Sequence, residues 1–160
     1  MIVIADAGPI LHLYWVDASS WALPPQTIDV VDEVWHEVGK YEPQALSDSR
    51  LRRTVITPPW PPELFSWKLD AGELAALAYA VRHRDTDDVL VLCDEHEARK
   101  ACSQLAIPVV GSVGLIVRAF HAGRVAGDVA QTALRDLPGR GRLHVTKALI
   151  ELAVEMLSQP

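Results

Sequence analysis

Two short apolar runs that each end directly at an aspartate constrain the fold of this chain more than any other feature. Ile2 to Ala5 is followed at once by Asp6, and Val89 to Cys93 is followed at once by Asp94. Uninterrupted apolar runs of this length are typical of strands buried on both faces, as in a parallel sheet. Because ligands bind beyond the carboxyl ends of such strands, we expect the two carboxylates to meet at one edge of the sheet.

Segments with helical periodicity alternate with these and other short apolar segments. Helices are predicted over residues 9–16, 32–38, 70–84, 95–105 and 111–122, and further strands at 28–31, 54–57 and 107–110. This alternation predicts an α/β fold in which helices flank a central parallel sheet. Two later helices, near 128–137 and 145–157, predict a helical C-terminal extension. We expect a single domain over residues 1–160, with a core of about 1–122 and an extension of about 123–160.

The composition is that of a globular protein, but the net charge bears on function. The chain has 49% hydrophobic and 22% charged residues, and its formal net charge is -6. A nucleic-acid binder commonly carries a basic patch, so this acidity is unusual for one. An active site built from carboxylates makes a chain acidic by itself, and a divalent metal would cancel part of that charge. Phosphate chemistry is therefore compatible with the composition.

The cysteines and the N-terminus point to a cytoplasmic protein without membrane contact. Cys93 and Cys102 lack the spacing of metal ligands, so we expect two buried thiols in a reducing compartment. The N-terminal apolar run has no basic flank and is interrupted by Asp6, unlike a signal peptide. No segment approaches the ~18 apolar residues that a membrane span requires.

Asp6 and Asp94 are the first candidate site residues, and they differ in how easily capping explains them. Asp94 with Glu97 fits a helix capping box, so a structural role for Asp94 stays open. If Pro9 begins a helix, Gly8 is its N-cap, and Asp6 then lies too early to cap. The functional interpretation is therefore stronger for Asp6.

Two glutamates complete the set of candidates. Glu73 shares a helix face with Leu69, Ala76 and Leu77, and a carboxylate on an apolar face needs a partner. A capping box between Asp70 and Glu73 is the structural alternative. Glu37 lies near the end of an amphipathic helix, where a solvated face is the alternative.

Five segments of the chain resemble the sequence blocks of PIN domains. They are Val3–Ile10, Val34–Val38, Leu69–Leu77, Val91–Ala101 and Val110–Ile116. No single block is specific, but the five occur in family order over about residues 1–122. The branch that the chain resembles most is that of VapC-type toxins, whose C-terminal extension is helical. One departure is Ala7, where many members have serine or threonine.

The resemblance implies a three-layer PIN-like fold and cleavage of RNA with Mg²⁺ or Mn²⁺. The acidic quartet of the family, which is catalytic and binds the metal, matches Asp6, Glu37, Glu73 and Asp94. Glu95 stands where the family often has a further acid, and it is a candidate to assist in metal binding. Ser112 matches a small hydroxyl residue near the metal-bound water. A metal ion lowers the pKa of a bound water and so generates a hydroxide that can attack the scissile phosphorus.

The resemblance also implies partners. RNA would be the substrate, a protein antitoxin would block the site if the chain is a toxin, and many such nucleases are homodimers. Arg50, Arg52 and Arg53 form a small basic cluster, for which RNA contact and a solvated face are the two interpretations. The histidines are scattered, and we interpret them as structural or surface residues. The five tryptophans are expected mainly in the core, with an interface as the alternative.

Three other classes of function compete with the ribonuclease. A PIN fold that binds RNA or serves as a scaffold without cleavage stays open, although the intact quartet argues against it. A phosphohydrolase with an aspartate nucleophile would need a second aspartate at position 8, which is Gly8. A receiver-type signalling domain would need a lysine at the end of a late strand, and Val109 to Gly111 offers none.

Overall fold

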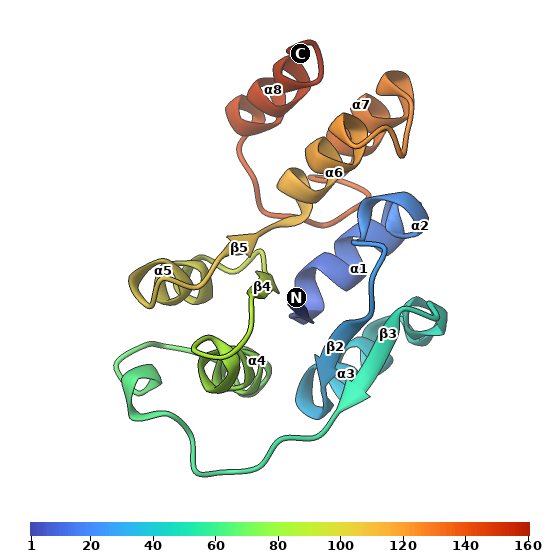
Figure 1. The fold of residues 1–160 in the computed structure, drawn as a ribbon. Helices are drawn as coiled ribbons and strands as arrows, with labels where there is room; N and C mark the ends of the chain where they lie inside the picture. Colours follow the sequence, from blue (N-terminus) through green and yellow to red (C-terminus); the bar gives the residue numbers. More distant parts are fainter.

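The computed structural model describes residues 1–160 and contains one five-stranded sheet in which all strands are parallel (Figure 1). The strands are β1 (Ile2–Ala5), β2 (Ile28–Val31), β3 (Leu51–Thr54), β4 (Val89–Leu92) and β5 (Val109–Val110). The α-helices are α1 (Ala7–Trp15), α2 (Ser19–Ala22), α3 (Asp32–Tyr41), α4 (Ala71–His83), α5 (His96–Gln104), α6 (Ser112–His121), α7 (Gly127–Asp136) and α8 (Lys147–Met156). Two short 3₁₀ helices, η1 (Pro43–Ser47) and η2 (Pro62–Leu64), lie between them.

The strand order is β3-β2-β1-β4-β5, with β1 at the centre. All strands are parallel, but successive strands are added on one side of β1 first and then on its other side. The chain moves from β1 to β2 and β3 on one side, then returns to β4 and β5 on the other side. Right-handed crossovers therefore put α1 and α3 on one face of the sheet and α4 and α5 on the opposite face, as Figure 1 shows. The three-layer α/β architecture expected from the sequence is confirmed. The switch point between β1 and β4 is where such sheets form a crevice.

The core forms because the central strands are apolar on both faces. Val3, Ile4 and Ala5 of β1 are fully buried, and α4 packs against β1, β2 and β4 with a face of small residues. All five tryptophans are partly buried against this core, so core packing is their principal use. Cys93 and Cys102 are free and buried, as expected.

The expected elements are present, with shifted ends. The strand predicted at 54–57 lies instead at Leu51–Thr54, as β3. The prediction relied on apolar runs, and Arg52 and Arg53 interrupt the apolar pattern of this edge strand. Helix α1 begins at Ala7, so Asp6 and not Gly8 occupies its N-cap position. The Asp6 side chain makes no capping hydrogen bond there, so its carboxylate is not explained as a cap. Pro58 to Pro62 lies in an ordered segment that leads into η2.

The C-terminal residues form helices that pack on the core. Helices α7 and α8 contact each other and α6, and α6 contacts α1 and α2. The predicted helical extension is therefore present, and the turn between α7 and α8 returns to the sheet region, where Leu143 is buried. None of the helices combines the length and the apolar character that crossing a membrane requires.

A buried carboxylate ties the edge strand β3 to the sheet. Asp29 of β2 has a side chain only 4% exposed, and it accepts hydrogen bonds from three groups. The donors are Arg52 Nε at 2.6 Å, Thr54 Oγ1 at 3.1 Å and Tyr79 OH at 3.3 Å. Strand β3 is only four residues long, and two of its side chains, those of Arg52 and Thr54, bind Asp29. The network is therefore a main attachment of the polar side chains of β3 to the sheet.

We predict that Asp29→Ala destabilises the fold by about 2 kcal/mol, because Tyr79 loses a partner in a half-buried position and β3 loses its side-chain attachment. Urea unfolding followed by circular dichroism measures the change. Asp32→Ala is the matched control, since it also removes an ion pair with an arginine of β3, but from a carboxylate that is 29% exposed and not 4%. Equal effects of the two substitutions would contradict a special role for Asp29.

Candidate active site

Asp6 lies at the carboxyl end of the central strand and is buried. It follows Ala5 directly, its backbone N–H donates to the carbonyl of Leu92 in β4, and the residue is 4% exposed. The thiol of Cys93 lies 3.5 Å from Asp6 Oδ2 and donates to it. The two apolar runs were predicted to end at one edge of the sheet, and the parallel pairing of Ala5 with Leu92 places both ends there.

Asp94 follows Cys93 at the end of β4 and is oriented by the start of α6. Ser112 donates to it twice, from its backbone N–H to Oδ1 at 2.7 Å and from its hydroxyl to Oδ2 at 2.6 Å. A Cβ atom at Gly111 would lie 2.5 Å from Asp94 Oδ1, so only glycine permits this approach. Glu95, not Asp94, occupies the N-cap position of α5. The capping interpretation of Asp94 does not hold, and the two hydrogen bonds from Ser112 fix the orientation of the carboxylate.

Glu73 has both of the roles that its sequence context suggested. The capping box is present, since Asp70 Oδ1 accepts from the Glu73 N–H at 2.8 Å and Glu73 Oε2 accepts from the Asp70 N–H at 3.0 Å. Glu73 is also 7% exposed and close enough to Asp6 for their charges to interact. The capping contacts therefore fix a carboxylate that belongs to the acidic site.

Glu37 and Glu95 face the same region from other elements. A Cβ atom at Gly72 would lie 3.3 Å from Glu37 Oε2 and 3.5 Å from Asp70 Oδ1, so these two carboxylates lie beside each other above the start of α4. Glu37 is half-buried, and the interpretation as a fully solvated residue is not supported. Glu95 is exposed at the start of α5 and lines the same cleft.

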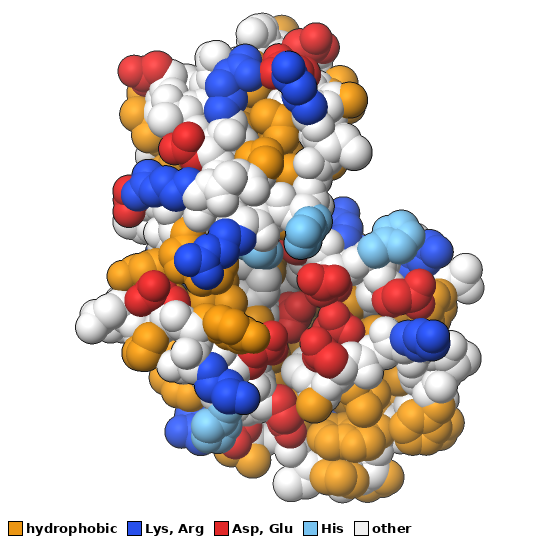
Figure 2. All heavy atoms as spheres, turned by 180° about the vertical axis from the view of Figure 1, so that it is seen from behind, with side chains coloured by type: hydrophobic (Ala, Val, Ile, Leu, Met, Phe, Trp, Pro, Cys, Tyr) orange, Lys and Arg blue, Asp and Glu red, His pale blue; other side chains and the backbone are white.

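Four of these carboxylates, Asp6, Glu37, Asp70 and Glu95, line a cleft of about 450 Å³, and the more deeply buried Glu73 interacts with Asp6 through its charge. Figure 2 shows acidic side chains concentrated in a hollow of one face of the molecule, with histidine and other basic side chains at its margin. The residues that line the cleft are Asp6, Ala7, Gly8, Leu11, His12, Trp15, Glu37, Tyr41, Asp70, Glu95, Arg142 and His144. Asp94 lines an adjoining groove that shares His144 with the cleft.

Sequence reasoning missed several residues of this cleft. Asp70 was interpreted as a cap only, yet its charge acts on Asp6 and Glu37. His12 was interpreted as structural or surface, yet its Nε2 lies 3.9 Å from Asp94 Oδ2. Arg142 reaches the cleft from the C-terminal extension. The Gly-Arg-Gly-Arg segment at 139–142 was the available signal for that residue.

The electrostatics of the cleft disfavour its full negative charge. The pKa of Asp6 is raised to about 7, chiefly by burial; a hydrogen bond from the backbone of Ala7 opposes this, and the charges of Glu73, Asp70 and Glu37 add to it. Burial and neighbouring carboxylates also raise the pKa values of Glu37 and Glu73. A positive charge among these groups would relieve both the desolvation and the repulsion.

The donor set suits a hard divalent cation, but the side chains do not form a ready cage. No three His, Cys, Asp or Glu side chains are arranged so that they could hold a metal ion directly. Mg²⁺ commonly keeps several waters and binds one or two carboxylates, so it does not need such a cage. The oxygen ligands and the raised pKa of Asp6 therefore fit an ion held partly through water.

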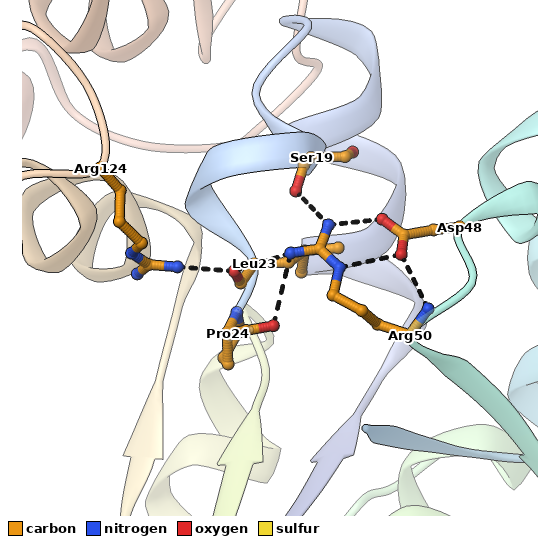
Figure 3. Close-up of polar contacts among 6 residues, drawn as sticks. All are labelled: Ser19, Leu23, Pro24, Asp48, Arg50 and Arg124. Atoms are coloured by element: carbon orange, nitrogen blue, oxygen red, sulfur yellow. Dashed lines mark hydrogen bonds and ion pairs between the residues drawn. The ribbon is translucent and has the colours of Figure 1, made fainter. Parts of the chain in front are cut away.

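The predicted RNA-binding arginines are occupied by contacts within the chain. Figure 3 shows Arg50 pairing with Asp48 and donating to the carbonyls of Ser19, at the start of α2, and of Leu23 and Pro24, which follow this helix. Arg50 precedes β3, whereas Asp6 follows β1, and the strands are parallel. Arg50 therefore lies at the amino end of the strands and Asp6 at their carboxyl end.

The two following arginines are also paired. Arg52 pairs with Asp29 and Arg53 with Asp32. These contacts support a structural use of the cluster, and RNA contact by it stays a prediction.

The parallel sheet is a doubly wound α/β sheet with an acid-lined cleft at its switch point. A family model described as a PIN domain matches residues 2–159, which is nearly the whole chain, and the chain belongs to the PIN-domain family. PIN domains are generally nucleases, and they typically use divalent metals. Searches among curated proteins and among solved structures found no match.

We predict that the metal-free protein loses stability as pH rises through the pKa of Asp6. That pKa is 3.8 before burial and about 7 in the folded protein, so the folded state binds this proton more tightly. Protonation of Asp6 therefore adds to the free energy of unfolding by about 4 kcal/mol at most. This stabilisation is complete below about pH 4 and is lost as pH rises to about 7 and above. Asp6→Asn removes the titration and should gain stability over wild type with rising pH, as measured by urea unfolding in chelator.

Asp128→Asn, which removes an exposed carboxylate from α7, controls for the loss of one negative charge. A wild-type stability that changes with pH in parallel with that of Asp6→Asn would show that Asp6 is not buried as a carboxylate.

Proposed function

We propose that this PIN domain is a metal-dependent endoribonuclease that cleaves RNA phosphodiester bonds with Mg²⁺ or Mn²⁺. The observation that carries the proposal is the convergence of buried and half-buried carboxylates from four separate segments at the switch point of the sheet. Asp6 follows β1, Glu37 lies in α3, Glu73 in α4, and Asp94 follows β4. Such a convergence costs stability without a cation, and a structural role does not require it.

Each residue has a part in the proposed reaction. Asp6, Glu37, Glu73 and Asp94 would hold the metal, directly or through water. Ser112 fixes the Asp94 carboxylate, and the capping box fixes Glu73, so both ligands are oriented before substrate binds. When bound, the metal supplies a water of lowered pKa and stabilises charge on the phosphorane. Glu95, exposed in the same cleft, is the candidate to accept the proton of the attacking water.

The proposal extends to a biological role as the toxin of a toxin–antitoxin pair, with a protein antitoxin as partner and a homodimer as the assembly. This role rests on the resemblance to VapC-type proteins. Growth arrest on expression of the wild type, but not of Asp6→Asn, is the expected result. Light scattering of the purified chain tests the dimer.

A catalytically silent PIN domain that binds RNA is the second candidate. It is favoured by the lack of a ready cluster of metal ligands in the structure. The two candidates differ in one measurement, since only the first predicts that RNA is cut and that chelator stops the cutting.

We predict that the purified protein cleaves single-stranded RNA with Mn²⁺ or Mg²⁺, and that Asp6→Asn and Asp94→Asn each reduce the rate at least about 100-fold. Gel analysis of labelled RNA measures the rate. Glu155→Gln, an exposed carboxylate in α8, should retain wild-type activity. Cleavage that survives in both aspartate variants or in excess chelator would overturn the mechanism, and binding without any cleavage would favour the silent candidate.

A second prediction concerns Ser112. Ser112→Ala removes the 2.6 Å hydrogen bond from the hydroxyl to Asp94 Oδ2 and keeps the backbone hydrogen bond to Oδ1. We expect activity or metal affinity to fall about 10- to 100-fold, the range for a group that orients a metal ligand. Isothermal titration with Mn²⁺ and the cleavage rate report the two effects. A variant indistinguishable from wild type in both measurements would show that Ser112 only packs against Asp94.

A further inference from the structure

Arg142 is a cation in the acid-lined cleft that the chain itself does not neutralise. Its guanidinium lies 4.5 Å from the centroid of the Trp15 ring, and it makes no ion pair or side-chain hydrogen bond within the chain. The side chain is exposed and lines the same cleft as Asp6 and Glu37. By contrast Arg140, two residues earlier in the same turn, is paired with Asp17 and with Asp136.

The turn that carries Arg142 is held rigidly against α1. His12 Nδ1 donates to the carbonyl of Gly141 at 2.6 Å, and the backbone N–H of Leu143 donates to the carbonyl of Leu137 at 2.9 Å. A Cβ atom at Gly141 would lie 2.7 Å from the Leu137 carbonyl oxygen, so the chain can approach this closely only with glycine. These contacts fix the backbone from which the Arg142 side chain enters the cleft.

The backbone of Arg142 supports the same conclusion. Its φ of 55° lies in the left-handed region, which an arginine seldom adopts. Such a conformation persists only when the surroundings enforce it, and it is found preferentially at functional sites. Asparagine or glycine would adopt the same backbone with less strain.

We propose that Arg142, supported by Trp15, binds a backbone phosphate of the RNA strand at the edge of the active-site cleft. A guanidinium that stacks on an aromatic ring keeps its in-plane N–H donors free, and these match two phosphate oxygens at once. The chain has a net charge of -6, and a phosphate that approaches this cleft meets several carboxylates, so a fixed cation beside them is needed for substrate to enter.

This inference rests on the proposed function and adds a positioning residue to it. Arg142 binds the substrate and takes no part in bond cleavage. It therefore contributes to RNA affinity and KM, whereas the carboxylates contribute to kcat. The stacking on Trp15 also restricts the guanidinium, which lowers the entropy that is lost when the phosphate binds.

Binding is tested in the Asp94→Asn background, where cleavage is suppressed. Fluorescence anisotropy of a labelled single-stranded oligoribonucleotide measures affinity between ~50 and ~200 mM salt. Arg142→Asn should weaken binding about tenfold and make the slope of log K against log salt shallower by about one, as for loss of one phosphate contact. Arg142→Lys keeps the charge but not the paired donors, so its RNA affinity should lie between that of the parent protein and that of Arg142→Asn.

Arg140→Asn is the matched control, because it removes the same charge from the same turn outside the cleft. It should change RNA affinity less than about twofold, since a surface charge without phosphate contact has little effect at these salt concentrations. Equal effects of Arg142→Asn and Arg140→Asn on affinity and slope would overturn the proposal, as would the absence of RNA binding in the parent protein. Arg142→Gly repeats the measurement if thermal unfolding shows that the asparagine variant does not fold.

Cleavage kinetics separate this inference from the proposed function. In an otherwise wild-type chain, Arg142→Asn should raise KM about tenfold and leave kcat within about threefold. Cleavage with an unchanged KM would refute the role of Arg142 and leave the nuclease intact. RNA binding that depends on Arg142 in a protein that never cleaves would support Arg142 and refute the nuclease.

Discussion

The burial of one carboxylate at the end of the central strand is the constraint on which the site depends. β1 is paired on both sides, so the residue that follows it is enclosed by the elements that follow β1, β2 and β4. That residue is Asp6, and its neighbours Glu73, Asp70 and Glu37 are themselves acidic. The fold thus holds these carboxylates in an arrangement in which full negative charge is disfavoured, and a cation bound among them would relieve the repulsion.

The polar contacts around the cleft orient the carboxylates without neutralising them. Ser112 donates to Asp94 from a helix N-terminus, and Asp70 and Glu73 exchange hydrogen bonds with each other's backbone N–H groups. Neither set of contacts contains a paired cation. This differs from Asp29, which is buried and has Arg52 as its partner. The comparison separates a carboxylate that stabilises the sheet from carboxylates that are available to a ligand.

The sequence predicted the strand ends well and the tertiary contacts poorly. Apolar runs located Asp6 and Asp94, because burial on both faces leaves a clear pattern. The capping interpretation of Asp94 could not be decided from local sequence, since the contact that excludes it comes from Ser112, eighteen positions later. For Glu73 the capping and functional interpretations were treated as rivals, and both hold. Strand β3 was misplaced because an edge strand tolerates the charged residues that break an apolar pattern.

The C-terminal extension shows why the chain's net charge is a poor guide to its substrate. The catalytic candidates all lie in residues 6–95, whereas Arg142 and His144 reach the same cleft from the turn between α7 and α8. His12 links the two parts, since its ring contacts the carbonyl of Gly141, 129 positions away. The net charge sums the carboxylates of the core and the basic side chains of the extension over the whole chain. A phosphate group in the cleft would instead interact with each of these charges locally. The extension therefore supplies Arg142, the only lysine or arginine among the residues that line the cleft.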